Sequence, residues 1–116
     1  MSELNGMKQH GVFSWNELMT NDIDAAKGFY GELFGWQLED LKDVAMDYTM
    51  AKVKGTEVAG MMLAPAEAGK MPPMWGAYVT VDDIDKRLKQ VESLGGKVLV
   101  GPTEIPIGRF AVIADP

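Results

Sequence analysis

The side chains best suited to chemistry in this sequence lie on one predicted strand, "VFSWNELMT", residues 12–20. Because side chains alternate between the two faces of a strand, Trp15, Glu17 and Met19 share one face. If this face points into the protein, a carboxylate beside a tryptophan loses hydration, which raises its pKa and suits it to act as a general base. Glu17 is therefore the candidate catalytic residue. An ion pair with Arg109, or an exposed position at a dimer interface, would explain it equally well.

The sequence offers Glu17 no obvious catalytic partner. Thr80 has no histidine beside it in the predicted fold, and no glycine-rich phosphate-binding loop is present. Trp15 and Tyr78 instead supply flat faces for a planar or sugar-like ligand. The nine methionines could form an adaptable binding surface, or they could simply fill a small core.

Two predicted helices must hold this strand face in position. The first begins at an N-cap oxygen of Asn21 or Asp22 and ends at Gly35, and the second begins at Asp82 or Asp83. Apolar residues at helical spacing predict one buried stripe on each helix. The stripes are Ile23, Ala26, Tyr30, Leu33 and Phe34 in the first helix, and Ile84, Leu88, Val91 and Leu94 in the second.

The chain repeats one plan at a spacing of 61 residues. Adding 61 to the residue number takes Asp22 to Asp83 and Gly35 to Gly96, so the starts and ends of the two helices agree. A strand–helix–strands unit used twice explains this better than the alternative, which is that any two capped amphipathic helices look alike. The same shift pairs Trp15, Glu17 and Met19 with Gly76, Tyr78 and Thr80 in turn, and it pairs Tyr48 with Arg109.

The repeat predicts a first module at 11–64, a connector at 65–73 and a second module at 74–116. Prolines keep the connector out of a helix or a central strand, and its length lets the modules pair within one chain or between two chains. The strand at 57–64 should recur at about 118–125. The second module is therefore expected to lack its last strand within these 116 residues.

Composition excludes several classes of function. The chain has 116 residues, no cysteine and a net charge of −6. Disulfides and thiol-bound metals are excluded, and the negative charge makes binding to nucleic acid or to an anionic membrane unfavourable. No apolar run is long enough to span a membrane. We therefore expect a cytoplasmic protein.

The stretches "ELMTNDIDAAKGFYGELFGW", "AYVTVDDIDKRLKQVESLGGKVLVGP" and "GRFAVIADP" resemble the vicinal oxygen chelate superfamily. This superfamily includes glyoxalases, bleomycin resistance proteins and extradiol dioxygenases. The resemblance implies an α+β fold in which two βαβββ modules form curled mixed sheets around a shared cavity. It also implies a homodimer, as in many members, and places the inward face of each module's first strand in the cavity.

Metal-dependent members carry His or Glu ligands on these inward faces, the first of them seven residues before the Asp that opens each helix. Those positions hold Trp15 and Gly76 here, and neither can bind a metal. The later position in the first module falls within residues 60–62, which are Gly-Met-Met, and the fourth lies past Pro116. We therefore expect no metal and no other cofactor. If this alignment is wrong, a metal-dependent enzyme is the alternative.

The leading hypothesis is a metal-free glyoxalase/bleomycin-resistance-like protein that binds a small aromatic or planar organic ligand. Its predicted ligand-binding residues are Trp15, Glu17, Met19, Tyr48, Met62, Gly76, Tyr78, Thr80 and Arg109. One alternative is a lyase or isomerase of the same superfamily with Glu17 as its base. Another is a dimerising module without a ligand, since a fold alone does not fix a function.

Overall fold

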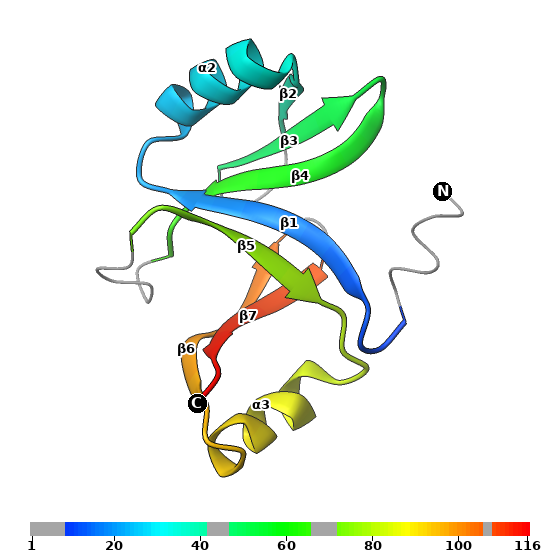
Figure 1. Cartoon of the computed structure of the whole chain (residues 1–116), viewed down its shortest axis with the longest axis vertical. Coiled ribbons are helices and arrows are strands. Elements are labelled where there is room, and N and C mark those ends of the chain that lie inside the picture. The colour runs from blue at the N-terminus through cyan, green and yellow to red at the C-terminus, as the bar shows by residue number, and fades with distance from the viewer. Residues whose placement is uncertain (1–8, 42–46, 66–71, 106–107) are drawn as a thin grey trace.

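The computed structural model describes residues 9–41, 47–65, 72–105 and 108–116. Its elements run strand, helix, three strands, then strand, helix and two strands (Figure 1). The predicted α+β class is confirmed, because curled strands of mixed direction lie between two outer helices. The predicted connector at 65–73 lies mostly outside the described residues.

The larger sheet has five strands in the order β2-β3-β4-β1-β5. Its strands are β1 (Phe13–Thr20), β2 (Gln37–Asp40), β3 (Tyr48–Val53), β4 (Thr56–Leu63) and β5 (Met74–Val79). β1 pairs in parallel with β4 on one side and antiparallel with β5 on the other. The first strands of the two halves, β1 and β5, therefore lie side by side, and one face of each borders the same cavity.

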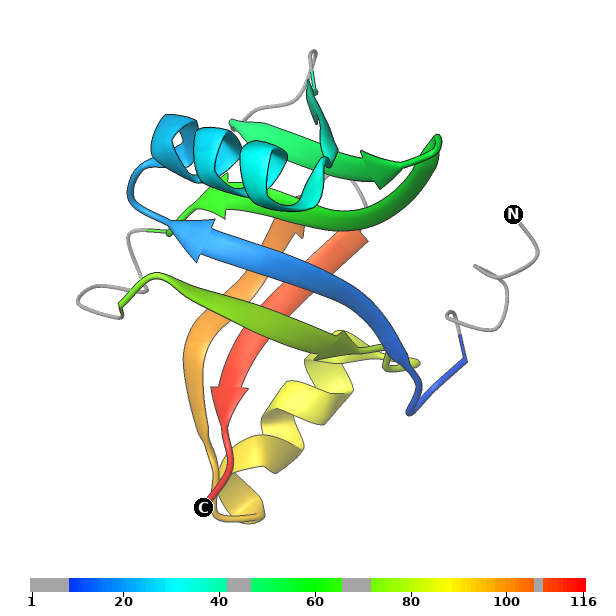
Figure 2. The same ribbon diagram turned by 45° about the horizontal axis from the view of Figure 1, so that its top comes forward.

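The second half continues with α3 (Ile84–Ser93), β6 (Lys97–Ile105) and β7 (Gly108–Ala114). β6 and β7 form a separate antiparallel pair that crosses behind the larger sheet (Figure 2). Side chains of this pair join the buried core of the larger sheet. The core cluster comprises Met19, Tyr48, Met50, Met62, Val100, Ile105 and Phe110. Residues from both halves thus share one hydrophobic core.

Each helix begins at one of its two predicted N-cap candidates, Asp22 for the first helix and Asp83 for the second. The Asp22 side chain accepts a hydrogen bond from the backbone N–H of Ala25 at 3.0 Å, and α2 (Ile23–Phe34) starts there. The Asp83 side chain accepts from the N–H of Lys86 at 3.1 Å at the start of α3. Such caps satisfy N–H groups that have no partner within the helix. Neither helix in the described ranges is long and apolar enough to cross a membrane.

The prediction that each helix buries an apolar stripe is wrong. No residue of α2 or α3 is buried, and Leu33 and Leu94 are 58% and 73% exposed. The reason lies in what the stripes contact. The ring of Tyr30 packs against other exposed or half-exposed rings, and no further layer of the described structure covers them. The Trp75 Nε1–H donates a hydrogen bond to the Tyr30 hydroxyl at 2.9 Å. These rings form an outer aromatic patch of Phe29, Tyr30, Phe34, Trp36 and Trp75.

Candidate functional site

Glu17 lies in the middle of β1 with a glycine beside it on each neighbouring strand. In the strand register it is opposite Gly60 of β4 and Gly76 of β5. A residue without a side chain leaves the sheet surface above it open. Two rings use this space. A Cβ at Gly60 would overlap the Tyr48 hydroxyl and lie 2.8 Å from the Tyr48 Cε1, while the nearest atoms to a Cβ at Gly76, including the Tyr78 Cε1, are 3.8 Å away.

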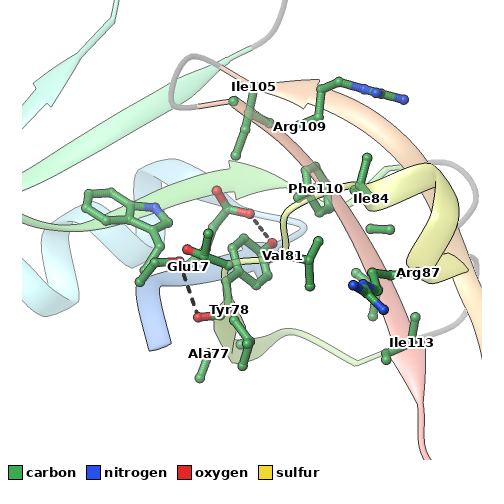
Figure 3. Close-up of a pocket in the computed structure, with 18 of the residues that line it drawn as sticks. Glu17, Ala77, Tyr78, Val81, Ile84, Arg87, Ile105, Arg109, Phe110 and Ile113 are labelled. Atoms are coloured by element: carbon green, nitrogen blue, oxygen red, sulfur yellow. Dashed lines mark hydrogen bonds between the residues drawn. The ribbon is translucent and has the colours of Figure 1, made fainter. Parts of the chain in front are cut away.

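These two tyrosines bind the Glu17 carboxylate, one at each oxygen. The Tyr48 hydroxyl donates to Oε2 at 2.6 Å. The Tyr78 hydroxyl donates to Oε1 at 2.5 Å, as Figure 3 shows. The Trp15 Nε1–H in turn donates to the Tyr48 hydroxyl at 3.0 Å. Glu17 is only 1% exposed, yet its oxygens and their phenol partners are all hydrogen-bonded. We call these four side chains the Glu17 cluster.

Burial sets the protonation chemistry of the cluster. Loss of hydration raises the pKa of Glu17, and the hydrogen bonds from Tyr48 and Tyr78 oppose this shift only in part. Burial and the nearby carboxylate also raise the pKa values of both phenols well above the usual range for tyrosine. The phenols therefore stay protonated and act as donors. Glu17 is the acid of the cluster, and its raised pKa favours the protonated carboxyl group more than in a solvent-exposed glutamate.

A cavity of about 1220 Å³ opens beside this cluster and is lined mainly by apolar side chains. Seven of the nine predicted ligand-binding residues line it: Trp15, Glu17, Met19, Gly76, Tyr78, Thr80 and Arg109. The other two, Tyr48 and Met62, are 1% and 2% exposed and belong to the core cluster behind the cavity wall. Tyr48 is therefore linked to the site through the hydrogen bond that its hydroxyl donates to the Glu17 carboxylate.

The suggested ion pair between Glu17 and Arg109 does not form. The Arg109 guanidinium faces Asp85 of α3, with Nη2 3.3 Å from Oδ1. Asp85 stands in the first turn of that helix, and the carboxylate of Glu17 is already held by two phenols. Arg109 therefore contributes a neutralised pair on the cavity wall and does not act as a counter-ion for Glu17.

Sequence reasoning missed one aromatic wall of the cavity. The ring of Phe110 stacks on Tyr78, with ring centroids 5.6 Å apart and planes 16° apart. The only signal for it was its place next to Arg109 on the third strand of the second module. The sequence also assigned Ile84 and Leu88 to a buried stripe, whereas both line the cavity from α3.

Among the described residues, the side chains that line this site do not form a donor set for a divalent metal ion. The two inward positions that would carry ligands hold Trp15 and Gly76, and the space over Gly60 is filled by the Tyr48 phenol. Divalent metals in such sites need several imidazole or carboxylate ligands. Among the residues described, no three His, Asp or Glu side chains are grouped so that they could hold an ion.

Comparison with known proteins agrees with this architecture. The family model described as "Glyoxalase/Bleomycin resistance protein/Dioxygenase superfamily" matches residues 11–116. The chain is 38% identical over 112 residues to "Putative glyoxylase CFP32" of Mycobacterium bovis, covering 93% of this chain and 43% of that protein. It is 34% identical over 120 residues to "Anthracycline biosynthesis protein DnrV" of Streptomyces peucetius, covering 91% and 44%. The chain spans less than half the length of these relatives.

A solved structure has the same fold. The hypothetical protein BH1468 from Bacillus halodurans C-125 superposes with a TM-score of 0.54 and 14% sequence identity, covering 90% of this chain and 85% of that one. At this identity the likeness concerns the fold alone.

Proposed function

The chain belongs to the glyoxalase/bleomycin resistance protein/dioxygenase superfamily, and from that premise we propose that it binds a small planar aromatic molecule in its cavity without a metal ion. The Glu17 cluster carries the proposal. Glycines flank Glu17 on both neighbouring strands, the Tyr48 ring occupies the space over Gly60, and the Tyr78 ring lies at contact distance from Gly76. A wall of rings with a few converging polar groups is the usual lining of a small-molecule site.

The ring geometry supports a flat ligand. Tyr78 and Phe110 already stack in near-parallel planes, and Trp15 lines the same cavity from β1. Aromatic rings attract one another in offset-stacked or edge-on arrangements, beyond the area that they bury. A planar molecule can therefore extend the Tyr78–Phe110 stack and place a polar substituent near the Glu17 carboxylate.

The names of relatives support the same class of ligand. One relative is named for anthracycline biosynthesis, and anthracyclines are fused, planar aromatic ring systems. That protein is more than twice as long as the region it shares with this chain. We therefore take only the class of ligand from its name, and we do not assign its activity to this chain.

We expect an anthracycline to bind the purified chain, and replacing Trp15 by leucine should weaken binding about tenfold. Loss of one stacking ring corresponds to about 1.4 kcal/mol. Isothermal titration calorimetry measures both dissociation constants. Trp75→Leu is the matched control, because Trp75 lies in the outer aromatic patch and should leave the affinity unchanged. Chelator treatment should also change nothing.

The absence of any heat of binding, or equal weakening by the two tryptophan substitutions, would contradict this proposal. Because Trp15 also bonds to Tyr48, circular dichroism should first show that Trp15→Leu is folded.

A second candidate, proton transfer catalysed by Glu17, is favoured by one contact. The Tyr78 hydroxyl lines the cavity and donates to a carboxyl group whose pKa is raised by burial. A pair of this kind can move a proton to or from a bound carbon acid, as a lyase or isomerase requires. A bound ligand incubated in D2O should then exchange C–H for C–D, followed by NMR, and Glu17→Gln should slow the exchange at least about a hundredfold. Equal rates in parent and variant would leave only the binding function.

A further inference from the structure

The hydrogen bonds of the Glu17 cluster all point toward its carboxylate. The Trp15 Nε1–H donates to the Tyr48 hydroxyl, and this hydroxyl donates to the Glu17 Oε2. The Tyr78 hydroxyl donates to Oε1 from the other side. This arrangement suits an ionised carboxylate, which only accepts hydrogen bonds. A protonated Glu17 carries one O–H of its own and has to donate it to one of the two phenols.

The Tyr48 hydroxyl cannot accept the hydrogen bond of a protonated Glu17 without a penalty. An indole N–H can only donate, so Trp15 uses the Tyr48 oxygen as its acceptor and leaves the Tyr48 O–H to be donated elsewhere. Tyr48 is 1% exposed, and among the described residues its hydroxyl has only Glu17 as an acceptor. Reversing this bond would bury an O–H group without an acceptor, which is unfavourable.

The Tyr78 hydroxyl is not constrained in this way. Among the described residues, its only hydrogen-bond partner is the Glu17 carboxyl group. The hydroxyl hydrogen can therefore turn, so that the Tyr78 oxygen accepts from Oε1 and the Tyr78 O–H becomes available to another acceptor. Tyr78 lines the cavity, whereas Tyr48 lies in the core behind the cavity wall. The proton on Glu17 thus decides which hydrogen-bonding group Tyr78 offers to the cavity.

A ligand in the cavity meets Tyr78 before it meets Glu17. The Glu17 side chain is only 1% exposed, because the two phenols cover its carboxyl group. The space beside Tyr78 is open on β5, since the atoms nearest to a Cβ at Gly76 are 3.8 Å away. The Tyr78 ring is held by its stack on Phe110, so only the hydroxyl hydrogen has to turn.

We propose that Tyr78 selects the polar substituent of the ligand, donating to a carbonyl oxygen when Glu17 is protonated and accepting from a hydroxyl group when Glu17 is ionised. The proposal rests on the proposed function, because it needs a planar aromatic ligand in the cavity. It narrows the ligand class to aromatic ketones or quinones in one state of the site and to phenols in the other.

The other charged groups around the cavity are engaged elsewhere. Arg109 of β7 pairs with Asp85 of α3, and Arg87 of α3 pairs with Asp82. Glu57 of β4 lines the cavity, and its charge acts on Tyr48, where it adds to the rise in the pKa of the phenol.

Burial raises the pKa of Glu17, and the hydrogen bonds from the two phenols oppose this rise. The phenols themselves stay protonated, because burial and the nearby carboxylate raise their pKa values. Any dependence of the selection on pH should therefore follow the titration of Glu17.

Two uncharged naphthalenes serve as probes. 2-Acetonaphthone offers only a carbonyl acceptor, and 2-naphthol offers a hydroxyl donor. NMR titration of the full chain from pH 4 to pH 8 measures both dissociation constants, and carbon NMR follows the Glu17 carboxyl group over the same range. As Glu17 ionises, the affinity for 2-acetonaphthone should fall about tenfold and the affinity for 2-naphthol should rise, an effect of about one hydrogen bond.

Glu17→Gln should fix the selection in one state. The amide oxygen accepts from Tyr48, and the amide NH2 donates to the Tyr78 oxygen, so the Tyr78 O–H is offered to the ligand at every pH. This variant should bind 2-acetonaphthone as tightly as the protonated parent does, without dependence on pH. If Glu17 of the parent stays protonated throughout the range, parent and variant should agree at every pH.

Two further variants complete the test. Tyr78→Phe keeps the ring that stacks on Phe110 but removes the hydroxyl, so it should bind 2-acetonaphthone about tenfold more weakly than Glu17→Gln does and show no dependence on pH. Asp85→Asn removes a different carboxylate from the cavity wall and should retain the pH dependence of the parent. Circular dichroism should show that each variant is folded.

The outcomes separate this inference from the proposed function. If neither probe binds the parent or the Glu17→Gln variant, the proposed function fails and the selection by Tyr78 fails with it. If the probes bind but Glu17→Gln keeps a pH dependence of the parent, only the selection is overturned. The same holds if Tyr78→Phe binds 2-acetonaphthone as tightly as Glu17→Gln does.

Discussion

Gly60→Ala should destabilise this protein by about 3 kcal/mol, lowering Tm by about 10 °C. A Cβ at this position would overlap the Tyr48 hydroxyl and ring. The ring cannot swing aside, because Tyr48 is 1% exposed and packs in the core cluster with Met50 and Met62. Moving it would also break the hydrogen bond to Glu17 and leave a buried carboxylate oxygen without its donor. Urea unfolding followed by circular dichroism measures the loss.

Gly76→Ala is the matched control for this prediction. Gly76 lies on the other side of Glu17 in the same sheet, but the nearest atoms to its added Cβ are 3.8 Å away, an ordinary contact distance. The unfolding free energy of the Gly76→Ala variant should differ from that of the parent by less than about 1 kcal/mol. Equal effects of the two substitutions would show that Tyr48 does not lie over Gly60.

The stability that Glu17 contributes to the folded state should fall as the pH rises above the pKa that Glu17 has in the unfolded chain. Its pKa is raised from 4.5 in the folded chain, mainly by burial. Between the unfolded and folded pKa values the folded state holds one more proton than the unfolded state, so the free energy of unfolding decreases with pH in that window. Within this window the free energy of unfolding falls by up to about 1.4 kcal/mol per pH unit, and it becomes constant above the folded pKa.

Glu17→Gln removes this titration while retaining a side chain that can bond to both phenols. The difference in unfolding free energy between parent and variant, measured from pH 4 to pH 8, cancels every other titrating group. This difference should move in favour of the variant as the pH rises from the unfolded pKa of Glu17 to its folded pKa, and it should level off above the folded pKa. A difference that stays flat, or that moves in favour of the parent, would mean that the folded structure does not raise the pKa of Glu17.

Local sequence patterns predicted most of the framework. Caps at Asp22 and Asp83 fixed the helix starts, because a cap needs only a side-chain oxygen and the first N–H groups of its own helix. Alternation along β1 placed Glu17 on the same face as Trp15 and Met19 for a similarly local reason, and the resemblance to the superfamily implied that this face points inward. The homodimer, the ligand and the absence of a metal remain predictions.

The contacts of Glu17 could not be read from the sequence in the same way. Alternation assigns a residue to a face of the sheet but says nothing of which ring will reach it from another strand. The partner Tyr48 depends on β4 having no side chain at position 60, and so on the register between β1, β3 and β4. The prediction that the apolar stripes of the two helices are buried was wrong for a related reason. Periodicity indicates an apolar face but does not show whether a core, a cavity or other rings will cover it.

The distribution of indole rings gives the molecule an internal optical reporter. Trp15 belongs to the Glu17 cluster at the cavity wall, whereas Trp36 and Trp75 lie in the outer aromatic patch. Converting the two outer indoles to phenylalanine leaves a single emitter whose N–H is bonded to Tyr48. The colour and intensity of its fluorescence then report on the interior of the cavity alone, without any attached dye.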